Sequence, residues 1–285
     1  MPIDKSSGRV PEALAEVAVA DAPAATTRIY DDIARLAGIP LPALIWRHIA
    51  TRPDVLAAAW QALRPLYAAG LVQESAWRTV RETLAGETSA VTAGALRARK
   101  LGGDTIAAYG RVLASYNRSN PVNIVGVRIL LARMDVASPV EPLPAAAPWS
   151  PPEPIRDLAP MVPVREIPEA IRRLIDALAA DPAIDRASVV PSLYRHLVPW
   201  PALIEAIHAD LEPRIRSGEV GALLAKVAAA LGGLAGDLAV HVPPVVQIAE
   251  TPGLADTLRR FSGLIPEMVV IGHLLEQGLG EVGSG

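Results

Sequence analysis

A chain of 285 residues is long enough for two ordinary domains or for one large domain with internal pseudo-symmetry. Hydrophobic residues make up 51% of it and aromatic residues only 4%, so we expect a core of Ala, Leu, Val and Ile, a composition that favours helices. The net charge of -3 gives no electrostatic case for binding nucleic acid or an anionic membrane, and the absence of cysteine excludes disulfides, thiolate nucleophiles and zinc–thiolate sites.

The N-terminal part of the chain predicts a loose leader followed by a run of helices. Residues 1–25 show no clear periodicity, and the helical pattern begins at Thr26. Thr26 or Thr27 can cap a helix that ends near Gly38. Further helices are predicted over residues 43–51, from Pro53 onward, and over 74–84, 89–101, 104–116 and 121–133. No stretch alternates as a half-buried strand does, so the predicted fold class is all-α.

A proline-rich segment separates this part from a second helical part. Residues 136–164 hold nine of the 27 prolines, which remove backbone donors and fix the backbone, so we interpret the segment as a stiff, extended linker. Helices are then predicted over residues 167–180, 191–198, 201–217, 219–238, 254–263 and 266–279.

Residues on the two sides of the linker recur in the same order. Matched positions at one constant offset include Arg47/Arg195, His48/His196, Pro53/Pro201 and Pro65/Pro213, and Pro121 matches Pro266 at a slightly shorter offset. An Ala- and Leu-rich chain produces apolar matches by chance, but it does not readily align Pro, Arg-His and aromatic positions in one order. We therefore predict an ancient duplication, with helical repeats in residues 26–135 and 165–285.

The apolar composition raises the question of a membrane span. A span needs roughly 20 predominantly apolar residues, and the most apolar stretch, Ala222 to Val242, is interrupted by Lys226 and Asp237. We interpret this stretch as a buried helix and expect no membrane partner. Residues 1–9 lack the apolar centre of a signal peptide, so we expect a cytoplasmic protein.

Several short motifs together resemble the group I (D,L-specific) 2-haloacid dehalogenases over residues 26 to 280. They are Tyr30-Asp31-Asp32-Ile33, the Ile39-Pro40 turn, Trp60, the run from Tyr116 to Pro121, and Trp200-Pro201. The resemblance implies two all-helical repeats packed as an intramolecular pseudo-dimer, with the active site between them. It also implies hydrolysis of a carbon–halogen bond next to a carboxylate: an aspartate activates water, which displaces halide directly, and an asparagine helps to place that water.

Applied to this chain, the resemblance implies a ligand pocket that lacks the family's catalytic base. Asn117 matches the family's asparagine, and Ser192 matches the serine that precedes the catalytic aspartate. The aspartate position itself is occupied by Leu193, and a leucine cannot accept a proton. Apolar pocket residues of the family fall on Leu41 and Leu44. We expect one cavity between the halves, lined by Leu41, Leu44, Asn117, Ser192, Leu193 and Phe261.

A replacement base would have to come from another residue. His196 lies one helical turn after Leu193 and titrates near neutral pH, and Asp185 lies on the preceding loop, so these two and Asn117 are the catalytic candidates. The favoured alternative makes His48 and His196 matched structural residues. Asn117 and Ser192 have capping alternatives too, because both residue types are common at helix ends.

The residues predict neither a metal nor a cofactor. The sequence contains no His and carboxylate pattern with metal-ligand spacing and no glycine-rich phosphate loop after a strand. Three functional classes stay open: a hydrolase of small 2-substituted carboxylic acids with a rearranged base, a binding protein that kept the pocket, and an enzyme of different chemistry on the same fold. In each, the partner is a small-molecule ligand; nucleic acid is not expected, and a homodimer stays open.

Overall fold

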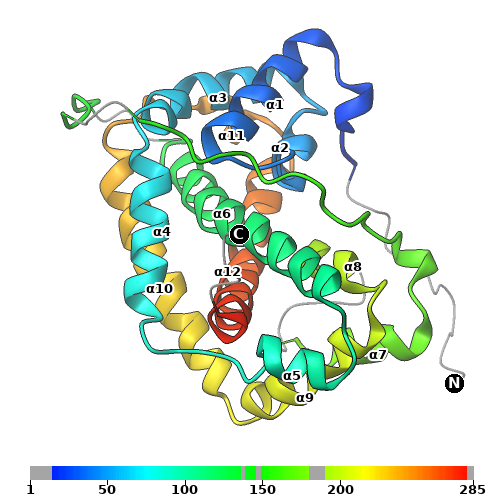
Figure 1. The fold of residues 1–285 in the computed structure, drawn as a ribbon. Helices are drawn as coiled ribbons and strands as arrows, with labels where there is room; N and C mark the ends of the chain where they lie inside the picture. Colours follow the sequence, from blue (N-terminus) through cyan, green and yellow to red (C-terminus); the bar gives the residue numbers. More distant parts are fainter. Residues whose placement is uncertain (1–14, 136–138, 146–148, 180–189, 281–285) are drawn as a thin grey trace, which may run out of the picture.

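The computed structural model describes residues 15–135, 139–145, 149–179 and 190–280 (Figure 1). Every regular element within these ranges is a helix, and no β-strand occurs among the described residues. The predicted all-α fold class is therefore confirmed.

Two runs of helices follow each other along the chain, one on each side of the proline-rich linker. The first run comprises η1 (Val19–Asp21), α1 (Ala24–Ala37), α2 (Leu44–Ile49), α3 (Pro53–Ala68), α4 (Leu71–Thr83), α5 (Ala93–Ala98) and α6 (Gly103–Ala132). The second comprises η2 (Val164–Glu166), α7 (Glu169–Asp176), α8 (Ser192–Leu197), α9 (Pro201–Arg216), α10 (Glu219–Ala239), α11 (Val246–Glu250) and α12 (Leu254–Leu279). In each run a short helix precedes one of 16 residues that begins at a proline, and a long helix ends the run.

Local sequence signals set many of the helix boundaries. Gly38 ends α1 in the left-handed conformation (φ 63°), which glycine adopts without a steric penalty. Gly70 and Gly218 are also left-handed and separate α3 from α4 and α9 from α10. Pro53 and Pro201 open α3 and α9, where the first turn requires no amide hydrogen from them. The pairs Gly70/Gly218 and Pro53/Pro201 occupy matched positions, as a duplication requires. The repeat itself stays a prediction, which a superposition of the two halves tests.

The prediction of a break near Pro121 and near Pro266 was wrong. Both α6 and α12 run unbroken through these prolines. Each proline is buried, and apolar residues that follow them, such as Val125 and Val270, are also fully buried. The burial of these side chains outweighs the one backbone hydrogen bond that a proline removes from a helix. As a consequence Asn117, which has the alternative of a helix-end cap in the sequence, lies inside α6.

The two long helices α6 and α12 cross at the centre of the fold and make its most extensive helix–helix contact (Figure 1). Beside them, α4 packs against α6, and α10 packs against α4, α6 and α12. Two short helices pack against the long helix of the other half: α8 of the second half packs against α6, and α2 of the first half packs against α12. One buried apolar cluster runs through both halves.

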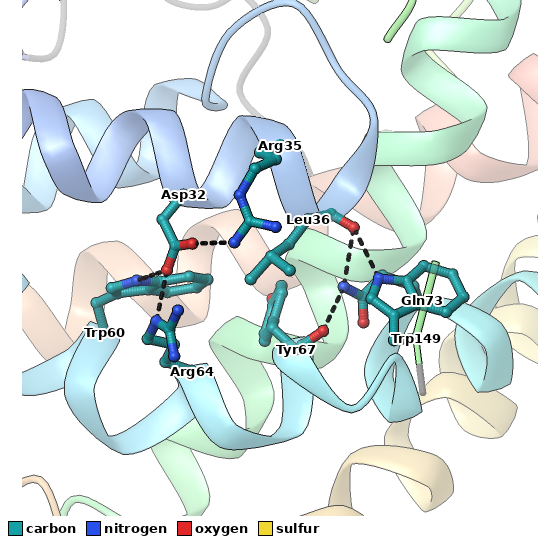
Figure 2. Close-up of polar contacts among 8 residues, drawn as sticks. All are labelled: Asp32, Arg35, Leu36, Trp60, Arg64, Tyr67, Gln73 and Trp149. Atoms are coloured by element: carbon teal, nitrogen blue, oxygen red, sulfur yellow. Dashed lines mark hydrogen bonds and ion pairs between the residues drawn. The ribbon is translucent and has the colours of Figure 1, made fainter. Parts of the chain in front are cut away.

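The described parts of the linker contain no helix before Val164, where η2 begins, and they contact both halves. Near its middle, Trp149 Nε1 donates to the carbonyl of Leu36 at the end of α1 at 3.4 Å (Figure 2). The Trp149 ring lies 6.1 Å from that of Trp77, centroid to centroid. Farther along, the amide of Val162 donates to the carbonyl of Arg195 on α8 (3.1 Å). The linker is therefore fastened to both halves, and its earlier part also contacts the second half, because the amide of Glu141 donates to the carbonyl of Val240 (2.9 Å).

One described helix, α10, is long and apolar enough to cross a membrane by length and composition alone. In this fold α10 packs against four other helices, and its residues Val227 and Leu231 are fully buried. A single helix of this kind is weak support for a membrane span, because core helices pass the same test. The expected lack of a membrane partner stays a prediction.

The crossing of α6 and α12 depends on a glycine. Asn117 Nδ2 donates to the carbonyl of Gly272 at 3.0 Å. A Cβ added at position 272 would come closer to Asn117 Oδ1 than real Cβ atoms come to any neighbour. Glycine at this position thus leaves room for the Asn117 side chain at the crossing of the two helices.

We expect Gly272→Ala to lower the free energy of unfolding by about 1–3 kcal/mol, because the added methyl overpacks the crossing. Gly263→Ala on the same helix is the control, since nothing lies within 4 Å of a Cβ placed there. That substitution should be neutral or stabilise by up to about 1 kcal/mol, the usual effect of replacing glycine inside a helix. Denaturant unfolding of both variants measures the difference, and equal effects would contradict this account of the crossing.

Candidate functional site

The Tyr-Asp-Asp-Ile motif lies on α1, where Asp32 joins α1 to α3. Its carboxylate accepts hydrogen bonds from Arg35 (2.5 Å), Arg64 (2.6 Å) and the indole of Trp60 (3.1 Å) (Figure 2). Burial tends to raise the pKa of Asp32, but these three hydrogen bonds outweigh it and hold the pKa below its ordinary value. The four residues line an open surface hollow of about 410 Å³. Because its carboxylate is already satisfied, we interpret this cluster as structural.

Position 193, where the resemblance implies a catalytic aspartate, lies in the core. Leu193 is 0% exposed on α8. Its neighbour Ser192 is hydrogen-bonded through its side chain to Tyr116 of α6, and the His196 ring lies edge-on to the Tyr116 ring, with centroids 5.7 Å apart. Burial raises the pKa of Tyr116, so its hydroxyl stays protonated at neutral pH. We call this group the α6–α8 junction.

The two matched histidines make matched contacts. His48 Nδ1 lies 2.7 Å from the carbonyl oxygen of Ala15, and His196 Nδ1 lies 2.5 Å from that of Ala159. A carbonyl only accepts, so Nδ1 carries the hydrogen in both rings. Burial lowers the pKa of His196, which keeps its ring neutral at neutral pH. These contacts support the structural interpretation, in which each histidine holds an extended segment against a short helix.

The matched arginines also hold those extended segments. Arg47 donates to the Glu16 carboxylate (2.6 Å), and Arg195 donates to the carbonyl of Val162 (2.9 Å). Both guanidinium groups therefore have partners within the protein.

The remaining predicted site residues lie on separate elements. Leu41 lies in the loop before α2 with 42% of its surface exposed. Leu44 is half-buried at the start of α2, and Phe261 is half-buried on α12. Asp185 lies outside the described residues. Among the described residues no hydrogen bond joins Asn117 to Ser192, so the proposal that these side chains line one cavity stays a prediction.

Asn117 instead lines a different hollow, which sequence reasoning missed. This hollow has a volume of about 320 Å³ and lies between α4, α6 and α12, with Pro152 of the linker at its edge. Its polar lining consists of Arg81, Asn117, Arg118, His273, Glu276 and Gln277. Its apolar lining includes Trp77, Val80 and Val269. We call it the α4–α6–α12 hollow.

The carboxyl group of Glu276, which lines this hollow, is hydrogen-bonded to Asn117. Asn117 Nδ2 donates to Glu276 Oε2 at 2.9 Å as well as to Gly272. Burial raises the pKa of Glu276, and the Asn117 hydrogen bond and the Arg118 charge oppose that effect only in part. A carboxyl group with a raised pKa beside a polar amide is a candidate for binding or proton transfer.

The basic groups around Glu276 differ in how they are held. Arg118 Nη1 donates to the carbonyls of Gly38 (3.1 Å) and Glu153 (2.6 Å), which fixes the guanidinium, and burial lowers the pKa of Arg118. His273 is buried, which lowers its pKa and favours the neutral ring. Arg81 is exposed at the edge of the hollow, and no ion pair is formed by it within the described part of the chain.

A weak sequence signal for this hollow existed. His273 and Glu276 are titratable residues three positions apart in a stretch of α12 that is otherwise mostly apolar, and this spacing places them on one helical face. The sequence could not reveal that Asn117 of α6 faces them, because that contact spans 159 positions. No group of three or more residues that could hold a metal ion occurs within the described ranges.

Comparison with known proteins places the fold. No protein-family model matches the chain, and no curated protein matches it in sequence. A solved structure of a D-2-haloacid dehalogenase mutant with D-2-CPA is 18% identical and matches with a TM-score of 0.68, covering 95% of this chain and 98% of that chain. The D-2-haloacid dehalogenase complex with L-LA is likewise 18% identical, with a TM-score of 0.67 and the same coverage. The chain therefore has the helical fold of these dehalogenase structures over nearly its whole length.

The raised pKa of Glu276 predicts how stability depends on pH. A carboxyl group whose pKa is higher in the folded state contributes stability below its unfolded-state pKa, and that contribution is lost as pH rises through the folded-state pKa. We therefore expect Glu276→Gln to gain stability relative to wild type as the pH rises from mildly acidic to neutral. Denaturant unfolding across this range measures the trend, with the exposed Glu205→Gln as the control for loss of one carboxylate. A difference that does not change with pH would contradict the raised pKa.

Proposed function

We propose that this protein is a 2-haloacid dehalogenase-like protein that binds a small 2-substituted carboxylic acid between its two halves and does not carry out ordinary hydrolytic dehalogenation. The fold it shares with D-2-haloacid dehalogenase structures along 95% of the chain supports the first part. Asn117, which matches the family's asparagine, lines a hollow formed by helices of both halves, and this supports a ligand site between them.

The burial of Leu193 is the observation that supports the lack of ordinary hydrolytic dehalogenation. Displacement of halide by water requires a base that takes a proton as the oxygen attacks, and positioned proton transfer of this kind is typically worth ~10²–10⁴ in rate. A leucine supplies no such group, and with 0% exposure it makes the site of the lost carboxylate apolar. The leucine side chain itself offers a water at this position no hydrogen-bond partner, which penalises the burial of that water relative to a site with a carboxylate.

The nearest candidate base does not restore this chemistry in a simple way. His196 is neutral and its Nδ1 is engaged by the Ala159 carbonyl, so only Nε2 is left to accept a proton. The lowered pKa makes that nitrogen a weaker base than an ordinary histidine. Asp185 has no described position, so its role stays a hypothesis.

An enzyme of different chemistry on the same fold is the second candidate. The pairing of Glu276, whose pKa burial raises, with the neutral His273 in one hollow favours it over a purely structural role. Titratable groups whose environments shift their pKa values are common at catalytic sites. The third class is a binding protein without catalysis, which requires no catalytic residue.

Chloride release from each enantiomer of 2-chloropropionate tests the proposal. We expect little or no chloride release by the wild type. The wild type is compared with Leu193→Asp, which restores the carboxylate. Leu193→Asn is the control, because asparagine has the size of aspartate and lacks its basic carboxylate. Activity in Leu193→Asp alone would mean that the scaffold retains the geometry and lacks one residue's chemistry. Robust turnover by the wild type would contradict the proposal and identify another base, with His196 and Asp185 the first to test.

A further inference from the structure

We infer that the α4–α6–α12 hollow is the site at which this protein binds a small monocarboxylate, with the ligand carboxylate held by Arg81 and Arg118 and with one proton taken up by Glu276 on binding. The inference deepens the proposed function: it rests on a small carboxylic acid as the ligand and names the residues that recognise it. It does not depend on the α6–α8 junction or on position 193.

The dimensions and walls of the hollow suit a small molecule with a short apolar body. Its volume of about 320 Å³ lies at the lower end of the range for ligand pockets. The Trp77 ring forms part of one wall, and its Nε1 donates to the carbonyl of Arg118 at 2.9 Å, which fixes the ring. Val80 and Val269 add aliphatic surface from α4 and α12.

Two guanidinium groups from different helices provide the anchor for an anion. Arg118 on α6 is fixed by the carbonyls of Gly38 and Glu153, both of which bind its Nη1. The other nitrogens of this side chain make none of the hydrogen bonds found among the described residues. Arg81 on α4 forms no ion pair within those residues. Guanidinium groups match a carboxylate in both charge and geometry.

The carboxyl group of Glu276 makes binding of a second carboxylate depend on a proton. The titratable groups that line the hollow are Arg81 from α4, Arg118 from α6, and His273 and Glu276 from α12; within the described chain the other helices that pack on α12 contribute none. Two carboxylates in one hollow repel each other, so a bound anion favours the protonated form of Glu276. Burial already moves the pKa of Glu276 in this direction.

A purely structural role does not account for this set of residues. Two arginines, a histidine, an asparagine and a glutamate surround an open space, whereas a helix crossing is stabilised at least as well by apolar side chains that fill it. A carboxyl group whose charged form is penalised by burial lowers stability at neutral pH. Such a penalty is common where side chains are kept for binding or catalysis.

Isothermal titration of the full chain with D- and L-2-chloropropionate, in mildly acidic and mildly alkaline buffers of different ionisation enthalpy, measures both affinity and proton uptake. We expect binding that weakens as the pH rises, with proton uptake. Arg81→Gln should weaken binding about tenfold or more, since it removes a hydrogen-bonded charge pair. Arg78→Gln, an exposed residue one turn earlier on α4, is the matched control and should leave affinity unchanged.

Glu276→Gln distinguishes proton uptake from a structural effect. This variant keeps the hydrogen-bonding shape, so it should bind with an affinity that no longer depends on pH and with no proton uptake. If the wild type binds the acids but neither Arg81→Gln nor Glu276→Gln changes affinity or proton uptake, the ligand lies elsewhere and this inference is wrong, while the proposed function stands. If the wild type binds neither enantiomer at either pH, both the inference and the proposed function are wrong.

Discussion

The close crossing of α6 and α12 is the constraint on which the rest of the structure depends. Asn117 reaches across it to donate to the carbonyl of Gly272 and to Glu276, so one amide group joins the long helix of the first half to that of the second. The missing side chain at position 272 leaves the space that the Asn117 amide occupies when it makes both hydrogen bonds. The helices α4 and α10 then pack alongside this pair and complete the contact between the halves.

The same crossing sets the electrostatics of the candidate site. Because Glu276 is held against Asn117 at the junction of three helices, it is withdrawn from water and its pKa rises. His273 and Arg118 are withdrawn with it, and the pKa of each falls for the same reason. The helical fold that this chain shares with D-2-haloacid dehalogenase structures therefore carries an apolar residue, Leu193, on α8 and a polar hollow between α4, α6 and α12.

Much of the fold could be predicted from local signals, and much of the site could not. Left-handed glycines such as Gly38 and helix-opening prolines such as Pro53 act within one turn, so the sequence marks them directly. The predicted break at Pro121 was wrong because burial by distant helices keeps α6 continuous. A local sequence pattern contains no information on that burial. The pairing of Asn117 with Glu276 was missed for the same reason, since tertiary packing alone brings α6 and α12 together.

A crystal structure of the wild-type protein with bound 2-chloropropionate tests the central claim most directly, because it locates the ligand without relying on catalysis. The account predicts one molecule in the α4–α6–α12 hollow, with its carboxylate within hydrogen-bond distance of Arg81 and Arg118 and its apolar end towards Trp77. A molecule bound at the α6–α8 junction beside Ser192, with the hollow unchanged, would contradict it.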